Sequence, residues 1–253
     1  RRPSATFVGR DQELQSLVEV LRSGRSIIIT GGGGIGKTEL LVHALHKAGT
    51  GRPVFWIDVE QHRTAADILL ELRTAVGAEG IACPEATLAD RLDALQACVV
   101  FDGVERATLE DLDGFEDTLV DLYRATAVAQ FVLTSQVMLH GFSADVRMRV
   151  SRLDDASSRT LLTAARPDFD RTDLAPLLTF CEGHTLTLRL AAALIDHFGG
   201  ASNALGVIKA QGVTAIRLPG RQQHNRANSL DLCLAASYEA VSADARRLLW
   251  IIA

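Results

Sequence analysis

Hydrophobic and polar positions follow two different periods along the first part of the chain. Short apolar runs rich in β-branched or aromatic residues predict buried strands at 26–30, 54–59, 98–101 and 130–134. A fifth strand is expected at 146–150, at an edge of the sheet, because apolar residues and arginines alternate there. Between these runs, apolar residues spaced three and four apart predict amphipathic helices. This order of elements predicts an α/β fold with a mostly parallel, five-stranded sheet covered by helices.

The pattern changes to helices alone after residue 152. We therefore predict an α/β domain at 1–152, a small helical domain at 153–213 and a polar linker at 214–228. A further helical region, 229–253, ends inside an apolar run with no stop signal, so we expect the sequence to be a fragment of a longer protein.

Composition and charge exclude several classes of protein. The net charge of −5 and a pI near 5.8 argue against a general nucleic-acid binder, so nucleic acid is not an expected partner of this segment. No apolar run approaches the ~20 residues of a membrane span, so no membrane partner is expected. The four cysteines are irregularly spaced and fit reduced thiols, which favours a cytoplasmic protein.

One motif carries specific chemistry. Residues 31–38 read Gly-Gly-Gly-Gly-Ile-Gly-Lys-Thr and satisfy G-x-x-x-x-G-K-[ST] between a predicted strand and a predicted helix. Glycines allow backbone N–H groups to turn toward phosphates, and the positive end of the following helix faces the same anion. The predicted nucleotide-binding set is Gly32, Gly33, Gly34, Ile35, Gly36, Lys37, Thr38 and Glu39.

Two of these residues have distinct roles in phosphoryl chemistry. Lys37 would reach the β- and γ-phosphates, and the Thr38 hydroxyl would ligate Mg²⁺. Asp102 ends a buried strand, where a carboxylate would hold Mg²⁺ through water; the alternative is an aspartate that only begins a turn before Gly103. We assign catalytic roles to Lys37 and Asp102, and metal binding to Thr38 and Asp102.

Further short motifs stand before and after the loop in a characteristic order. They are Phe7-Val8-Gly9-Arg10, Thr134-Ser135-Gln136, the segment 181–188 (Cys-Glu-Gly-His-Thr-Leu-Thr-Leu) and the segment 237–241 (Ser-Tyr-Glu-Ala-Val). Together with the phosphate loop, this order resembles the NB-ARC branch of the STAND ATPases. Those proteins are the switch modules of apoptosome-forming regulators, plant resistance proteins and bacterial regulators.

The resemblance implies a fold and a set of binding residues. It implies a P-loop NTPase sheet in which the strand of Asp102 is separated from the loop strand by one other strand, then a helical domain, and the start of a winged helix at 229–253. It places Val8, Gly9 and Arg10 beside adenine, Gln136 at the first sensor position, and Thr185 with Leu186 in the segment that covers the base.

The resemblance also implies a function. The cofactors would be ATP or ADP with Mg²⁺. The chain would act as a signal-transducing switch that self-associates in its ATP state, with effector and sensor domains outside this fragment.

Three residues depart from the family pattern and bear on hydrolysis. Gly103 replaces a residue that positions the attacking water, Gln136 replaces an arginine that senses the γ-phosphate, and Thr185 replaces a proline. Losing such groups slows phosphoryl transfer, so slow or absent hydrolysis is expected. Glu105 is near enough in sequence to act as a base, but we interpret it as an exposed turn residue. The alternatives are a hydrolysing AAA+-like motor and a degenerate, non-catalytic scaffold.

Overall fold

The computed structural model describes residues 1–59, 64–78, 87–105, 114–164 and 174–215. Contacts divide the chain into two compact units. The first comprises Arg1–Ser4 and Arg10–Ser151, and the second comprises Ala5–Gly9 and Arg152–Ala253.

The first unit is built on a parallel sheet of five strands. The strands are β1 (Ile27–Thr30), β2 (Val54–Asp58), β3 (Cys98–Asp102), β4 (Gln130–Ser135) and β5 (Val146–Arg149), and their spatial order is β2-β3-β4-β1-β5. Every neighbouring pair is parallel. The predicted α/β fold is confirmed, as is the position of β4 between the Asp102 strand and the loop strand. The predicted strand β5 lies at an edge of the sheet, also as expected.

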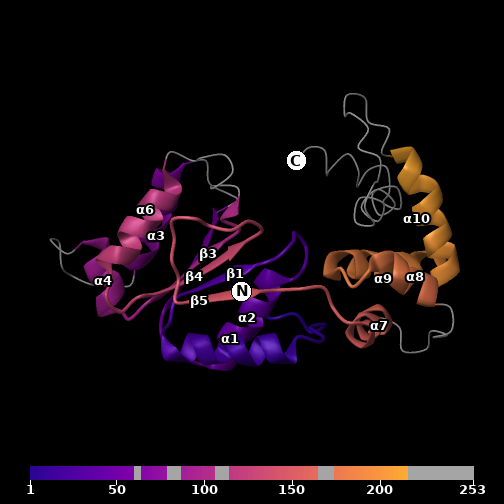
Figure 1. Ribbon diagram of the computed structural model, residues 1–253, viewed down its shortest axis with the longest axis horizontal. Helices are drawn as coiled ribbons and strands as arrows, with labels where there is room; N and C mark the ends of the chain where they lie inside the picture. The colour runs from indigo at the N-terminus through magenta and orange to yellow at the C-terminus, as the bar shows by residue number, and fades with distance from the viewer. Residues whose placement is uncertain (60–63, 79–86, 106–113, 165–173, 216–253) are drawn as a thin grey trace. The chain divides into compact units, whose positions relative to one another are not determined.

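Helices cover both faces of this sheet. They are α1 (Asp11–Ser23), α2 (Lys37–Ala48), α3 (Ala65–Ala78), α4 (Leu88–Ala94) and α6 (Phe115–Ala125). Figure 1 shows α1 and α2 on one side of the sheet and α3, α4 and α6 on the other. Both faces are thus withdrawn from water, which explains why the strands read as continuous apolar runs.

One face of the sheet carries the larger described core. Side chains at alternate strand positions point into it, as the period of two requires, and they are Ile28, Phe55, Ile57, Val99, Phe101, Phe131 and Leu133. The Phe101 and Phe131 rings stack with centroids 6.3 Å apart, and Tyr123 of α6 meets Phe131 edge-on at 5.5 Å. This packing fixes β3 and β4 as the rigid centre from which the site projects.

The second unit is helical among its described residues. It contains α7 (Asp155–Thr163), α8 (Ala175–Cys181), α9 (Thr185–Phe198) and α10 (Ala201–Ala215). Leucines and alanines from all four helices share one core, against which Val8 also packs. The turn between α8 and α9 requires glycine, because Gly183 has φ +71° and a Cβ there would lie 2.2 Å from the Leu153 carbonyl oxygen.

The end of the chain tests one prediction and leaves another untested. Helix α10 continues to Ala215, so the first two positions of the predicted linker 214–228 are helical. The rest of that linker and the predicted winged-helix start at 229–253 lie outside the described residues. Within the described ranges, no helix combines the length and the apolar character that a membrane span needs.

The two cysteines in the described ranges, Cys98 and Cys181, are buried free thiols. Burial raises the pKa of the Cys98 thiol to about 12, while the Arg52 charge lowers it by a smaller amount. Cys98 therefore stays protonated near neutral pH, and it serves as a small apolar residue of β3.

We expect Leu133→Ala to lower the free energy of unfolding by about 2–5 kcal/mol, because Leu133 is fully buried and the change leaves a cavity at the centre of the sheet. Chemical denaturation followed by circular dichroism measures this. Leu70→Ala on α3 is the matched control, since Leu70 is 63% exposed, and its effect should stay within about 0.5 kcal/mol. Equal effects of the two substitutions would contradict the assigned core.

Candidate functional site

The parallel register brings polar residues together where the strands end. Asp58 of β2 is the partner of Asp102 in β3, and Phe101 is the partner of Leu133, which places Thr134 beside Asp102. The glycine loop leaves the carboxyl end of β1 at the same edge of the sheet. Ligands of open α/β sheets bind at this edge, so the topology alone assembles a candidate site.

The glycine loop connects β1 directly to α2, whose first residue is Lys37. Lys37 is buried as a residue, and its ammonium donates to the carbonyl oxygens of Gly31 at 2.8 Å and Gly32 at 3.2 Å. The Ile35 side chain is also buried. The loop therefore curls around its own lysine, as a loop that cradles phosphates must.

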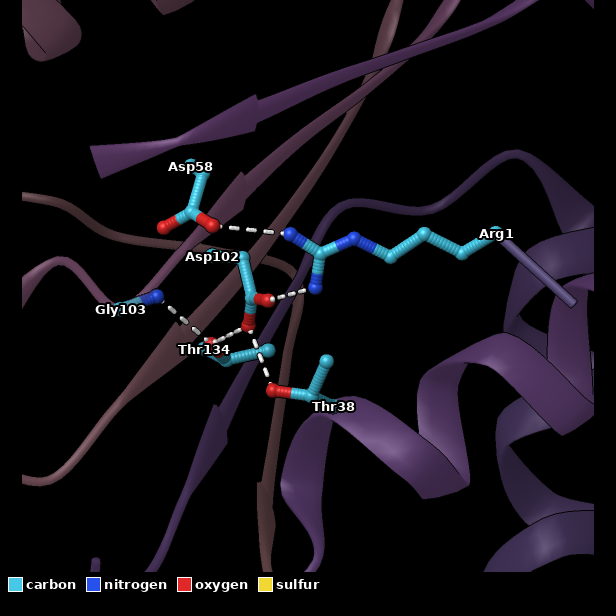
Figure 2. A network of polar contacts seen from close by, with 6 residues as sticks. All are labelled: Arg1, Thr38, Asp58, Asp102, Gly103 and Thr134. Carbon is cyan, nitrogen blue, oxygen red and sulfur yellow. Dashed lines mark hydrogen bonds and ion pairs between the residues drawn. The ribbon is translucent and has the colours of Figure 1, made fainter. Parts of the chain in front are cut away.

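The Asp102 carboxylate is the centre of a polar network at the end of β3 (Figure 2). Its Oδ1 accepts hydrogen bonds from the Thr38 hydroxyl at 2.8 Å and from the Thr134 hydroxyl at 2.6 Å. The Thr134 hydroxyl in turn accepts from the backbone N–H of Gly103 at 2.9 Å. The structure thus brings together the two residues assigned to metal binding, Thr38 and Asp102.

Arg1 joins this network from the beginning of the chain. Its guanidinium donates to Asp102 Oδ2 and to Asp58 Oδ2, both at 2.9 Å (Figure 2). It also lies 4.6 Å from the ring centroid of Trp56. Sequence reasoning assigned no role to Arg1 or Asp58. The register of β2 against β3 is the signal that could have placed Asp58 beside Asp102.

Glu105 corrects a sequence-based expectation. We expected an exposed turn residue, but Glu105 is only 7% exposed. Its carboxylate accepts hydrogen bonds from the Gln136 backbone N–H at 3.2 Å and from Gln136 Nε2 at 2.5 Å. The end of β4 is therefore tied to the segment that follows β3.

These groups line one pocket of about 290 Å³. Its wall is formed by the glycine loop, by residues at and just after the strand ends, and by Arg1. The lining residues are Arg1, Gly33, Gly34, Lys37, Thr38, Asp58, Asp102, Gly103, Glu105, Thr134 and Gln136. Six residues of the predicted set thus share one pocket within the first unit. Gln136 lies close to the loop at Gly33, because a Cβ added there would lie 2.9 Å from Gln136 Oε1 and the glutamine side chain would have to shift.

Two other predicted residues have their side chains engaged elsewhere in the first unit. The Arg10 guanidinium donates to the carbonyl oxygens of Ile35 and Ser151, both at 2.9 Å. Burial lowers the pKa of Arg10, and the nearby Glu13 carboxylate raises it. Glu39 accepts from the Ser4 backbone N–H at 2.8 Å and contacts His43 Nε2 at 3.1 Å. Arg10 and Glu39 therefore support the loop and helix α2 from outside the pocket.

Four predicted residues, Val8, Gly9, Thr185 and Leu186, belong to the second unit. Val8 packs against the helical core, and Gly9 lies so close to α7 that a Cβ would meet Ser157 Oγ at 2.5 Å. Thr185 begins α9, and Leu186 follows it half-buried. Their predicted adenine contacts stay predictions.

The donor set at the end of β3 suits Mg²⁺. This ion prefers oxygen ligands and is held in nucleotide sites by one or two protein oxygens, phosphates and water. The Thr38 hydroxyl and the Asp102 carboxylate, whose oxygens are 2.8 Å apart, match that requirement. No cluster of three or more His, Cys, Asp or Glu side chains able to hold a metal alone occurs in the described part of the chain.

Comparisons with known proteins identify the fold. A comparison with family models and with curated protein sequences found no match for this chain. The fold is similar to the Walker-type ATPase of Pyrococcus abyssi, with a TM-score of 0.63, 17% identity, and coverage of 85% of this chain and 75% of that one.

Two other solved structures share the fold over nearly the whole chain. A STAND protein from Pyrococcus horikoshii with a tetratricopeptide repeat sensor gives a TM-score of 0.57 at 16% identity. The match spans 98% of this chain but only 35% of that longer protein. Drosophila ORC bound to DNA gives a TM-score of 0.60 at 16% identity, with coverage of 98% and 86%. At these identities the likeness establishes the fold alone: the chain has the fold of a P-loop NTPase.

Thr134→Val should lower the free energy of unfolding by about 1–2 kcal/mol, because it removes a hydrogen bond to Asp102 and leaves the Gly103 N–H without its acceptor. Urea denaturation measures the change. Thr74→Val on α3 is the matched control, since Thr74 is exposed, and it should shift stability by less than about 0.5 kcal/mol. Identical unfolding midpoints for both variants would argue against the network.

Proposed function

We propose that the chain is the ATP- and ADP-binding switch module of a signal-transducing protein of the STAND class, NB-ARC type. In this proposal the bound nucleotide, with Mg²⁺, selects one of two arrangements of the protein, and hydrolysis is slow or absent. The observation that carries the proposal is the pocket in which Lys37, Thr38 and Asp102 lie together at the end of a parallel sheet.

The residues of the pocket have separable tasks in nucleotide binding. Backbone N–H groups of the loop and the first turn of α2 would face the phosphates, where the helix dipole also favours negative charge. Lys37 would exchange its carbonyl partners for phosphate oxygens. Thr38 and Asp102 would hold Mg²⁺, which supplies neutralising charge when bound. Thr134 keeps the Asp102 carboxylate oriented toward Thr38.

Two observations favour a switch over a motor. Gly103 follows Asp102 and provides no side chain to position an attacking water. Gln136, at the end of β4, carries no charge to stabilise the transition state, whereas an arginine at such a position accelerates hydrolysis by orders of magnitude. A switch tolerates slow turnover, because a ligand needs only different affinities for two states to shift their populations.

Several parts of this proposal concern the longer protein. Self-association in the ATP state, effector and sensor domains beyond this segment, a winged helix at 229–253 and a cytoplasmic location all follow from the resemblance or from composition. The similar STAND protein carries a tetratricopeptide repeat sensor, which fits this domain plan. The similar Drosophila ORC is bound to DNA, so the expectation that nucleic acid is not a partner stays a prediction.

We expect Lys37→Ala to weaken Mg²⁺-dependent binding of ADP by roughly 100-fold, because it removes the buried cation that faces the phosphates. Isothermal titration calorimetry measures the dissociation constant. Lys47→Ala is the matched control, since Lys47 is exposed in the last turn of the same helix and should bind ADP like the wild type. Equal affinity of the two variants would argue against this phosphate site.

The purified chain should retain ADP, because a resting switch holds its nucleotide between turnovers. Denaturation of the protein followed by ion-exchange chromatography would release and identify the nucleotide. If no nucleotide is released and added ATP and ADP do not bind, the chain is a scaffold with a decayed site. If ATP is hydrolysed rapidly at steady state, the motor hypothesis replaces the switch.

A further inference from the structure

Glu105 places a buried carboxylate in the wall of the candidate phosphate pocket. Glu105 is 7% exposed and lines the same pocket as Lys37, Thr38 and Asp102. Its oxygens are held by two neutral donors, the backbone and side-chain amides of Gln136. Among the residues that the structure describes, no lysine, arginine or histidine forms an ion pair with Glu105. Burial makes such a charge costly, so its presence calls for an explanation.

The Glu105–Gln136 pair lies in the part of the pocket where the γ-phosphate of a bound nucleotide would extend. Gln136 Oε1 lies against the loop at Gly33, 2.9 Å from where a Cβ on that glycine would stand. The lysine of such a loop reaches the β- and γ-phosphates, and the residues that would hold Mg²⁺ stand beside the same two groups. The pocket beyond Lys37 and Thr38 is therefore where a third phosphoryl group would extend, and Glu105 lines that pocket.

We infer that Glu105 is a specificity-determining residue that favours ADP over ATP. The inference rests on the proposed nucleotide-binding function. Both nucleotides bring the same Mg²⁺ ion and make the same contacts up to the β-phosphate. ATP alone adds negative charge in front of the Glu105 carboxylate, and like charges in a partly desolvated site repel strongly. The diphosphate ends before it reaches this carboxylate.

Gln136 strengthens the same preference. An arginine at the end of β4 would neutralise Glu105 and attract the γ-phosphate, whereas the glutamine amide does neither. The Gln136 amide donates its hydrogen bond to Glu105 and so holds the carboxylate in the pocket. The pair thus gives the site a built-in bias toward the resting nucleotide, which an activating signal has to overcome through differential stabilisation of the ATP form.

The test is the ratio of affinities for ADP and for a non-hydrolysable ATP analogue, each measured with Mg²⁺ by calorimetry on the 253-residue chain. Glu105→Gln keeps the size of the side chain and removes its charge. It should raise the affinity for the ATP analogue relative to that for ADP about tenfold, while the affinity for ADP changes less than about twofold. Glu19→Gln on the exposed face of α1 is the matched control and should leave the ratio unchanged.

Other outcomes separate this inference from the proposed function. An unchanged ratio in Glu105→Gln, with normal ADP binding, overturns the inference and leaves the nucleotide site intact. An unchanged ratio with abolished ATP turnover would also overturn it, because Glu105 would then act on the attacking water. Failure of the wild type to bind either nucleotide contradicts the proposed function itself.

A second variant guards against misfolding of the first. If Glu105→Gln loses its cooperative thermal transition, Gln136→Arg tests the same charge from the other side of the pair. The guanidinium would neutralise Glu105 and face the third phosphate, so the ratio should again shift toward the ATP analogue. A folded Gln136→Arg protein with the wild-type ratio would overturn the inference independently.

Discussion

The hydrogen bonds to the Asp102 carboxylate hold the site together, because they join three elements that are distant in sequence. Asp102 ends β3, Thr38 begins α2 after the loop, and Thr134 lies near the end of β4. These three side chains meet only if β3, β4 and β1 lie next to one another in that order and in the observed register. The core on the sheet therefore positions the site residues. The stacked Phe101 and Phe131 side chains fix β3 and β4, whose ends carry Asp102 and Thr134.

A second set of contacts links the phosphate loop to the boundary of the first unit. Arg10 is the residue at which the chain enters that unit, and Ser151 is the residue at which it leaves. The Arg10 guanidinium binds the carbonyl oxygens of Ser151 and of Ile35 in the loop. Val150 also packs against the start of the loop. Its backbone N–H donates to the Thr30 carbonyl oxygen, and its own carbonyl oxygen would lie 2.7 Å from a Cβ added to Gly31. The loop is therefore tied to Arg10 and Ser151, which stand at two of the three places where the chain crosses between the units.

The features that sequence reasoning predicted well are those encoded by neighbouring residues. The glycine loop, Lys37, Thr38 and the strand that ends at Asp102 can each be recognised from a few consecutive residues. The family resemblance predicted that β4 lies between β3 and β1. Asp58, Arg1 and Glu105 were missed or misread because their surroundings come from distant segments: Glu105 is buried by Gln136, which lies 31 positions further along the chain. Helix α10 was not predicted, since Gly206 and Gly212 interrupt its pattern and lower its helix propensity.

The charges of the pocket explain why a site with a strong phosphate motif can still be selective. Its described lining carries the carboxylates of Asp58, Asp102 and Glu105 against the cations of Arg1 and Lys37. Asp58 and Asp102 are neutralised by Arg1, and Asp102 would be neutralised by Mg²⁺ in the proposed complex. Glu105 faces neutral amides in either case, so its charge remains when the other carboxylates are compensated. In the proposed complex, Lys37, the loop amides and the metal would hold the first two phosphates. The response to a third phosphate would then depend on Glu105, the one carboxylate of this pocket that has no cation of its own among the described residues.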